Sequence, residues 1–98
     1  MSQIQFCTLT SASTTSNAVR IDLSRFRNGA GLLCNVSSGA TAAYTVQISA
    51  DGSNWNSHDV LIDQIGNSNG NLAFPVAFIR LSGTVSNGSV VLGIIQAS

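Results

Sequence analysis

The amino-acid sequence predicts an all-β fold, a small antiparallel β-sandwich or jelly roll of about seven to eight strands. Apolar residues recur at every second position in several short runs, which is typical of strands with one buried and one solvated face. Residue pairs that favour tight turns, such as Asp51-Gly52 and Asn87-Gly88, separate these runs. Surface helix formers are scarce, since the chain contains no Lys and no Glu. We therefore expect one β-sandwich domain over residues 1–98.

The alternation is clearest in two runs, 19–23 and 44–49, where apolar residues alternate with polar ones. The remaining expected strands are 4–9, 32–36, 76–81 and 90–96, with weaker ones at 60–62 and 71–74. Pro75 stands just before one of these runs, where a residue without a backbone N–H is tolerated. Further turns are expected at Asn28-Gly29, Ser38-Gly39 and Asn69-Gly70.

The run 90–96 is apolar on both faces, and no charged residue occurs between Leu81 and Ser98. An exposed edge of this kind would pair with other chains, because no charge blocks edge pairing. We therefore expect this strand either to lie in the centre of a sheet or to be buried by a neighbouring subunit.

Only eight of the 98 residues are charged, four Arg and four Asp, and their charges sum to zero. An average domain is about one-quarter charged. A neutral chain lacks the basic surface that nucleic acids and anionic membranes attract, and no run approaches the length of a spanning helix. We expect no nucleic-acid or membrane partner, synthesis in the cytoplasm without a visible export signal, and self-association, since no net charge separates the copies.

Residues for catalysis or metal binding are few. His58 is the only histidine, and its neighbour Asp59 would point to the opposite face of a strand, so we interpret His58 as a solvated loop residue. The stretch 51–54 faintly resembles part of a calcium loop, but the chain has no Glu to complete one. We therefore expect no enzymatic activity, no metal and no cofactor.

Cys7 and Cys34 both fall within expected strands. Cys34 shares its alternation with Leu32 and Val36, which predicts a small buried apolar side chain. A disulfide requires the two strands to be neighbours, and the absence of an export signal favours free thiols.

Arginines mark the candidate interface. Arg25 and Arg27 flank Phe26 just before a glycine turn, and Arg and aromatic residues are the usual anchors of protein contacts. The alternative is that Phe26 is buried and the two arginines are merely solvated. Arg80 shares its alternation with Val76 and Phe78, so it either ends a buried stripe beside an Asp or faces another subunit. The candidate interface residues are Arg25, Phe26, Arg27 and Arg80.

Trp55 follows the Asp51-Gly52 turn and has two interpretations. It either closes the hairpin as a core residue or forms, together with Tyr44, a surface on which a sugar stacks.

Three segments of the C-terminal half, 44–55, 74–81 and 88–96, carry a resemblance to known proteins. The first contains Trp55 just after its Asp-Gly turn, and the second contains the Ile-Arg-Leu sequence that ends at Leu81. Together they resemble small β-sandwich virion proteins of tailed bacteriophages, of the capsid decoration or cement type. The same pattern also looks like discoidin-type carbohydrate-binding modules, which are longer. Neither resemblance carries a catalytic residue.

The resemblance to decoration proteins implies a non-enzymatic virion protein that binds the major capsid protein on the outer surface of a phage head and stabilises it. A homotrimer at a threefold position would also hide an apolar strand edge. Two alternatives remain: a carbohydrate-binding or host-attachment module that uses Tyr44 and Trp55 for stacking, and an adaptor in the tail or neck of the virion.

Overall fold

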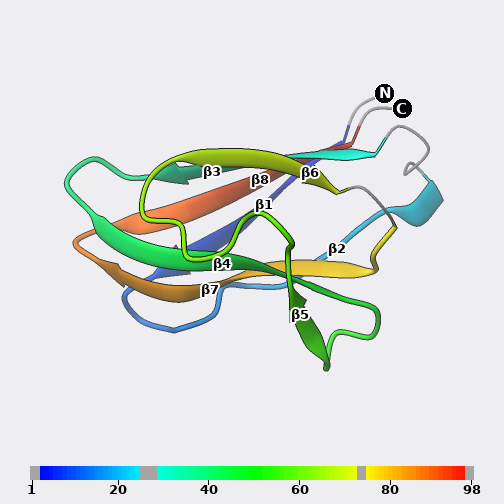
Figure 1. Ribbon diagram of the computed structural model, residues 1–98, viewed down its shortest axis with the longest axis horizontal. Coiled ribbons are helices and arrows are strands. Elements are labelled where there is room, and N and C mark those ends of the chain that lie inside the picture. The colour runs from blue at the N-terminus through cyan, green and yellow to red at the C-terminus, as the bar shows by residue number, and fades with distance from the viewer. Residues whose placement is uncertain (1–2, 25–28, 73–74, 97–98) are drawn as a thin grey trace.

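The computed structural model describes residues 3–24, 29–72 and 75–96. Eight strands form two antiparallel four-stranded sheets packed face to face, which confirms the all-β sandwich (Figure 1). The first sheet has the order β1 (Gln3–Thr10), β8 (Ser89–Gln96), β3 (Ala30–Val36), β6 (Ser68–Leu72). The second has the order β2 (Val19–Arg20), β7 (Phe78–Ser86), β4 (Thr41–Ser49), β5 (Trp55–Ser57).

The strands pair in a nested order. β1 pairs with β8, β2 with β7, β3 with β6 and β4 with β5. Among the connections, only the one from β4 to β5 is a hairpin within one sheet, and the others cross between the sheets. The link from β7 to β8 is the predicted Asn87-Gly88 turn, in which both residues have positive φ, 61° and 155°. This nested arrangement of eight strands in two sheets is a jelly roll.

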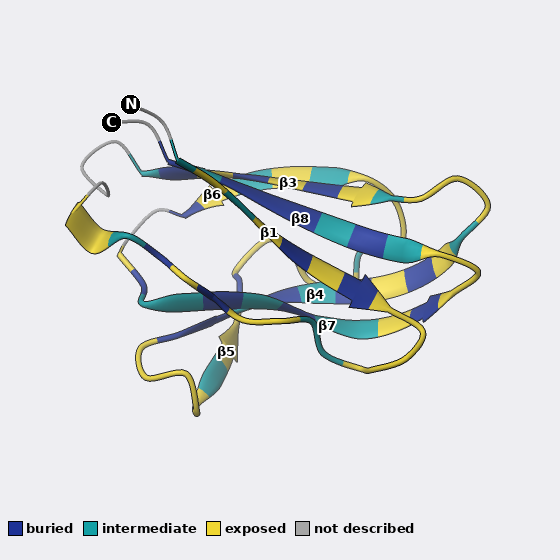
Figure 2. Ribbon diagram, turned by 180° about the vertical axis from the view of Figure 1, so that it is seen from behind, coloured by how far each residue is buried: buried dark blue, intermediate teal, exposed yellow. Residues whose placement is uncertain are grey.

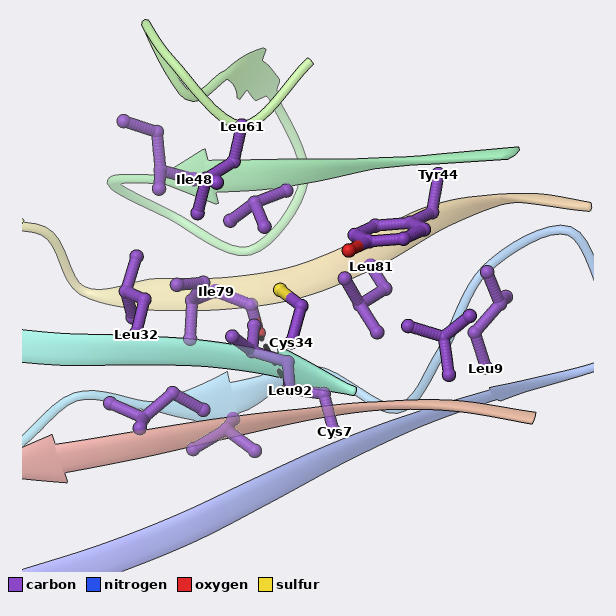
Figure 3. Close-up of a cluster of buried hydrophobic side chains, with 14 of the residues drawn as sticks. Cys7, Leu9, Leu32, Cys34, Tyr44, Ile48, Leu61, Ile79, Leu81 and Leu92 are labelled. Carbon is purple, nitrogen blue, oxygen red and sulfur yellow. Dashed lines mark hydrogen bonds between the residues drawn. The ribbon is translucent and has the colours of Figure 1, made fainter. Parts of the chain in front are cut away.

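The core lies between the two sheets. Figure 2 shows buried stretches alternating with exposed ones along the strands, and Figure 3 shows buried side chains that come from both sheets. β8 is an interior strand of its sheet, because β1 and β3 pair with its two edges. The apolar run 90–96 thus takes one of the two alternative positions expected from the sequence. Its inward residues Val90, Leu92 and Ile94 are fully buried. Each such side chain stabilises the fold by about 1.5–3 kcal/mol relative to exposure.

Several local expectations are wrong. Asn69-Gly70 lies inside β6 rather than in a turn, and 60–62 forms no strand. Instead, residues 58–64 follow β4 beyond β5 through isolated backbone hydrogen bonds, such as Val46 N–H to the carbonyl of Leu61. The run 19–23 pairs only at Val19–Arg20, and Leu23 is 55% exposed. The alternation of apolar and polar residues in a run does not show how far its partner strand extends.

His58 is buried, not solvated, with 3% of its surface exposed. Its Nδ1 accepts hydrogen bonds from the backbone N–H groups of Val60 and Leu61, both at 3.1 Å. Its Nε2–H donates to the carbonyl of Asn71 at 2.8 Å, with the ring proton on Nε2. The expectation that Asp59 points away from His58 is wrong, because Asp59 Oδ1 lies 3.3 Å from Nδ1. Because Asn71 belongs to β6 and His58 follows β5, the imidazole connects the two sheets.

Cys7 and Cys34 are free and buried. Both face Leu92 of β8, one from each side, so an entire strand separates them. Two strand spacings are about 10 Å, beyond the roughly 7 Å limit for the Cα atoms of a disulfide. Burial raises the pKa of Cys7 to about 11, and burial also raises the pKa of Cys34. The two thiols therefore act as small core residues.

We expect neither thiol to react with an aromatic disulfide reagent in the native protein at pH 8, and both to react after denaturation. The thiols are buried and their raised pKa values leave little thiolate at this pH. Counting the thiolate product released before and after adding guanidinium measures this directly. Rapid release of even one equivalent from the folded protein would contradict the buried placement.

Replacing His58 with Ala should lower the free energy of unfolding by about 2–4 kcal/mol, because it leaves two backbone N–H groups and one carbonyl without their partner. His58→Asn is the matched control, since an amide oxygen can still accept the two N–H groups. We expect it to recover part of the loss. Urea unfolding followed by circular dichroism gives both values. A loss below about 0.5 kcal/mol for His58→Ala would show that the connection between the sheets is unimportant.

Candidate functional site

Of the four candidate interface residues, the structure describes only Arg80. Arg25, Phe26 and Arg27 lie outside the described residues. Arg80 lies on β7. One sequence-based alternative placed it in a buried stripe with Val76 and Phe78, but the buried residues of β7 are the alternate ones. The inward residues of β7 are Ile79 and Leu81, whereas Arg80 and Phe78 are partly exposed on the outer face. The expected set was based on Val76, which lies before β7 begins and does not share the alternation of the strand.

Tyr44 is 1% exposed and lies in the core, so its ring is not available at the surface for stacking (Figure 3). Its hydroxyl is hydrogen-bonded to the carbonyl of Gly66 and, at 2.7 Å, to the Ser68 hydroxyl. Burial raises the pKa of Tyr44. The residue joins β4 to the start of β6 and has a structural role.

Trp55 begins β5, whose hairpin projects beyond the two layers (Figure 1). Its indole is partly buried, and the guanidinium of Arg80 lies 4.1 Å from the ring centroid. The Nε–H of Arg80 donates to the side-chain oxygen of Gln47 at 2.8 Å. No carboxylate of the described residues forms an ion pair with Arg80, so the Asp partner that one alternative required is missing. The three side chains cross β5, β4 and β7 on the outer face of the second sheet.

Asp51 organises the turn that places Trp55. Its carboxylate accepts hydrogen bonds from the backbone N–H groups of Asn54 and Ser53, at 2.8 and 2.9 Å, and from the Asn54 side chain. These donors, with that of Asn54 largest, hold the pKa of Asp51 far below its ordinary value. The carboxylate is therefore used to close the turn. Across the described ranges, no group of three or more His, Cys and Asp residues could hold a metal ion.

The outer face of the first sheet has no charge. None of the residues in β1, β8, β3 and β6 is Arg, Lys, Asp, Glu or His. The charged residues that the structure describes lie in the second sheet or in loops. These strands therefore present a neutral outer face made of apolar and uncharged polar side chains.

The centre of this face is apolar. Phe6 is 59% exposed, and it pairs across the strands with Gly93 of β8. Its ring covers that glycine, since a Cβ built on Gly93 would lie 3.5 Å from the Phe6 ring. Leu33 of β3 pairs with the same glycine from the other side and is also exposed. Around them on the same face lie Ile4, Val91 and Ile95. We call these six positions the β8 face: Ile4, Phe6, Leu33, Val91, Gly93 and Ile95.

Sequence reasoning missed the β8 face, although a signal was present. In β1 both alternating sets are apolar, with Phe6 next to Cys7, and β3 has the adjacent pair Leu32 and Leu33. In a two-layer fold, one member of each pair must face outward. Adjacent apolar residues in neighbouring strands therefore indicate an apolar outer face.

Comparison with known proteins places the chain in no family. No protein-family model matches it, and no curated protein or solved structure is significantly similar to it. No helix in the described part of the chain is long and apolar enough to cross a membrane. The functional argument therefore depends on the fold and on its two outer faces.

The Asp51 turn predicts acid sensitivity. Because the pKa of Asp51 is lowered in the folded state, its stabilising effect is fully present above about pH 4 and is lost as the pH falls below that value. Asp51→Asn should flatten the dependence of the melting temperature on pH between about 2.5 and 5. Equal slopes for Asp51→Asn and wild type would exclude this role.

Proposed function

We propose that the protein is a non-enzymatic structural protein of a bacteriophage virion, which binds the outer surface of the head as a decoration or cement protein. The observation that carries the proposal is the β8 face, an exposed apolar surface in the middle of a sheet without charges. Exposed apolar patches on small soluble domains mark contact sites. Its partner is a neutral, apolar patch on the major capsid protein, since a charged surface would lose hydration against this face without gaining an ion pair.

The size of the face supports repeated, individually weak contacts. The whole outer face of the first sheet, with four strands about 4.8 Å apart and up to about 27 Å long, covers roughly 500 Å² in plan, and the β8 face is only a part of it. A stable isolated interface usually buries about 800 Å² per partner. A single contact through the β8 face is therefore weak, whereas a trimer that engages several sites of a repeating shell adds the contacts together. This arithmetic favours a closed homotrimer on a capsid over a soluble one-to-one complex.

The strand order gives a further, weaker argument. Jelly rolls serve as viral capsid domains, lectin domains and cupins, so the architecture suits a virion protein without identifying one. The resemblance of segments 44–55, 74–81 and 88–96 to decoration proteins points in the same direction. A tail or neck adaptor would use the same face, and the position of bound protein on the virion distinguishes the two roles.

The glycan-binding alternative loses one of its two stacking residues, because Tyr44 is buried. Trp55 remains at the surface, with Arg80 on one face of its ring. A neutral sugar is therefore excluded from stacking where the guanidinium lies.

The experiment is to mix purified protein with phage heads that lack it and to image them by electron microscopy. Wild-type protein should add density on the outside of the head, and Phe6→Asp should reduce occupancy at least about tenfold, because a charge would be buried against an apolar surface. Ile65→Asp is the matched control: Ile65 is 79% exposed and lies outside the β8 face, so this variant should bind normally.

Leu33→Ser provides a second variant of the face, in case Phe6→Asp destabilises the sheet around Gly93. Circular dichroism must show that each variant is folded. Absence of bound density with the wild-type protein would refute the decoration role. Equal occupancy for Phe6→Asp, Leu33→Ser and Ile65→Asp would refute the β8 face as the docking surface.

A further inference from the structure

Arg80 is a partly buried cation on the outer face of β7. None of the carboxylates in the described ranges forms an ion pair with it. Among the described residues, its only hydrogen bond is the one from Nε–H to Gln47. The terminal N–H groups of the guanidinium have no partner among the described residues. These are the donors that bind a carboxylate through two parallel hydrogen bonds.

The guanidinium is held in place before any ligand binds. Trp55 supports its flat face at 4.1 Å from the ring centroid, and Gln47 holds its Nε–H at 2.8 Å. This cation–π contact between Arg80 and Trp55 stabilises the arrangement. Trp55 is itself fixed by the Asp51 turn, in which Ser49 Oγ accepts the N–H of Gly52 at 2.8 Å. A side chain ordered in advance loses little conformational entropy when a ligand binds.

The geometry points to a binding site for an acidic saccharide, such as a uronic or sialic acid, formed by Arg80, Trp55 and Gln47. The sugar carboxylate accepts hydrogen bonds from the terminal N–H groups of Arg80. The side-chain amide of Gln47 and the hydroxyl of Ser57, which pairs with Gln47 across the strands, can bind sugar hydroxyls. Trp55 is partly exposed, so the part of its indole that the Arg80 guanidinium does not cover can contact the sugar C–H groups.

The surroundings favour a saccharide over an acidic peptide. Neighbouring positions on the same outer face, Thr45, Gln47, Ser57 and Ser82, are neutral and polar. Arg20, which lies opposite Phe78 on β2, is a second cation on this face, but only Arg80 contacts Trp55 and Gln47. A uronic acid matches this arrangement, because it presents one carboxylate among several hydroxyls. The site also lies on the sheet opposite to the β8 face, so both surfaces can be occupied at once. The inference goes beyond head binding and does not depend on it.

The test uses Trp55, the only tryptophan of the chain. Its indole N–H gives a single side-chain resonance, which is followed while the full-length protein is titrated with glucuronate or N-acetylneuraminate. Glucose and acetate, at matched ionic strength, separate the contribution of the sugar from that of the carboxylate. We expect a saturable shift with at least one acidic sugar, and binding of glucose and of acetate weaker by at least about tenfold.

Arg80→Gln should weaken acidic-sugar binding by at least about tenfold, because it removes the charged donors. Arg20→Gln is the comparison for loss of an arginine charge. Arg20 lies opposite Phe78 on the neighbouring strand β2 and, among the described residues, contacts neither Trp55 nor Gln47, so Arg20→Gln should weaken binding less than Arg80→Gln. Phe6→Asp, on the other sheet, should bind normally, which separates this site from the proposed docking face. No saturable shift with either acidic sugar, equal binding of acetate or glucose, or an unchanged affinity of Arg80→Gln would each overturn the proposal.

Discussion

The whole sandwich depends on the burial of one strand. β8 supplies hydrogen bonds to β1 and β3 on its two edges, and its inward side chains fill the middle of the core. Removing β8 would leave β1 without any strand partner and β3 with only β6. The same strand is apolar on its outward side, where Val91 and Ile95 flank Gly93. The strand that completes the core therefore also contributes to an exposed apolar surface, the β8 face.

Much of the fold could be predicted from alternation and turn residues, because β1, β3, β4 and β8 have a regular inward set. The buried residues of β7 could not be predicted, because both alternating sets, Val76 with Phe78 and Ile79 with Leu81, are apolar. Only packing against the opposing sheet determines which set is buried. The burial of His58 could not be predicted either, because it depends on hydrogen bonds to the backbone N–H of Leu61 and to the carbonyl of Asn71 in β6. Whether such a residue is buried depends on contacts with residues far away in the sequence.

The candidate sites show the same limit. The sequence singled out Arg80 and Trp55 separately, one as an interface residue and the other as a core or stacking residue, but their contact depends on the pairing of β7, β4 and β5. Tyr44 shared the alternation of Val46 and Ile48 and is buried with them. The remaining interface candidates, Arg25, Phe26 and Arg27, lie outside the described residues, and their assignment stays a prediction.

The nested strand order has a consequence for how the chain reaches this structure. The innermost pair, β4 with β5, is local, whereas each pair outside it closes a longer loop at a greater entropic cost. β1 is synthesised first, yet its only strand partner is β8, the last strand along the chain. Until β8 emerges, β1 has no strand to pair with, although Cys7 can already contact Ile79 of β7 across the core. Folding is then dominated by distant contacts, which makes it slow compared with helical domains of the same size and exposes the newly made chain to aggregation.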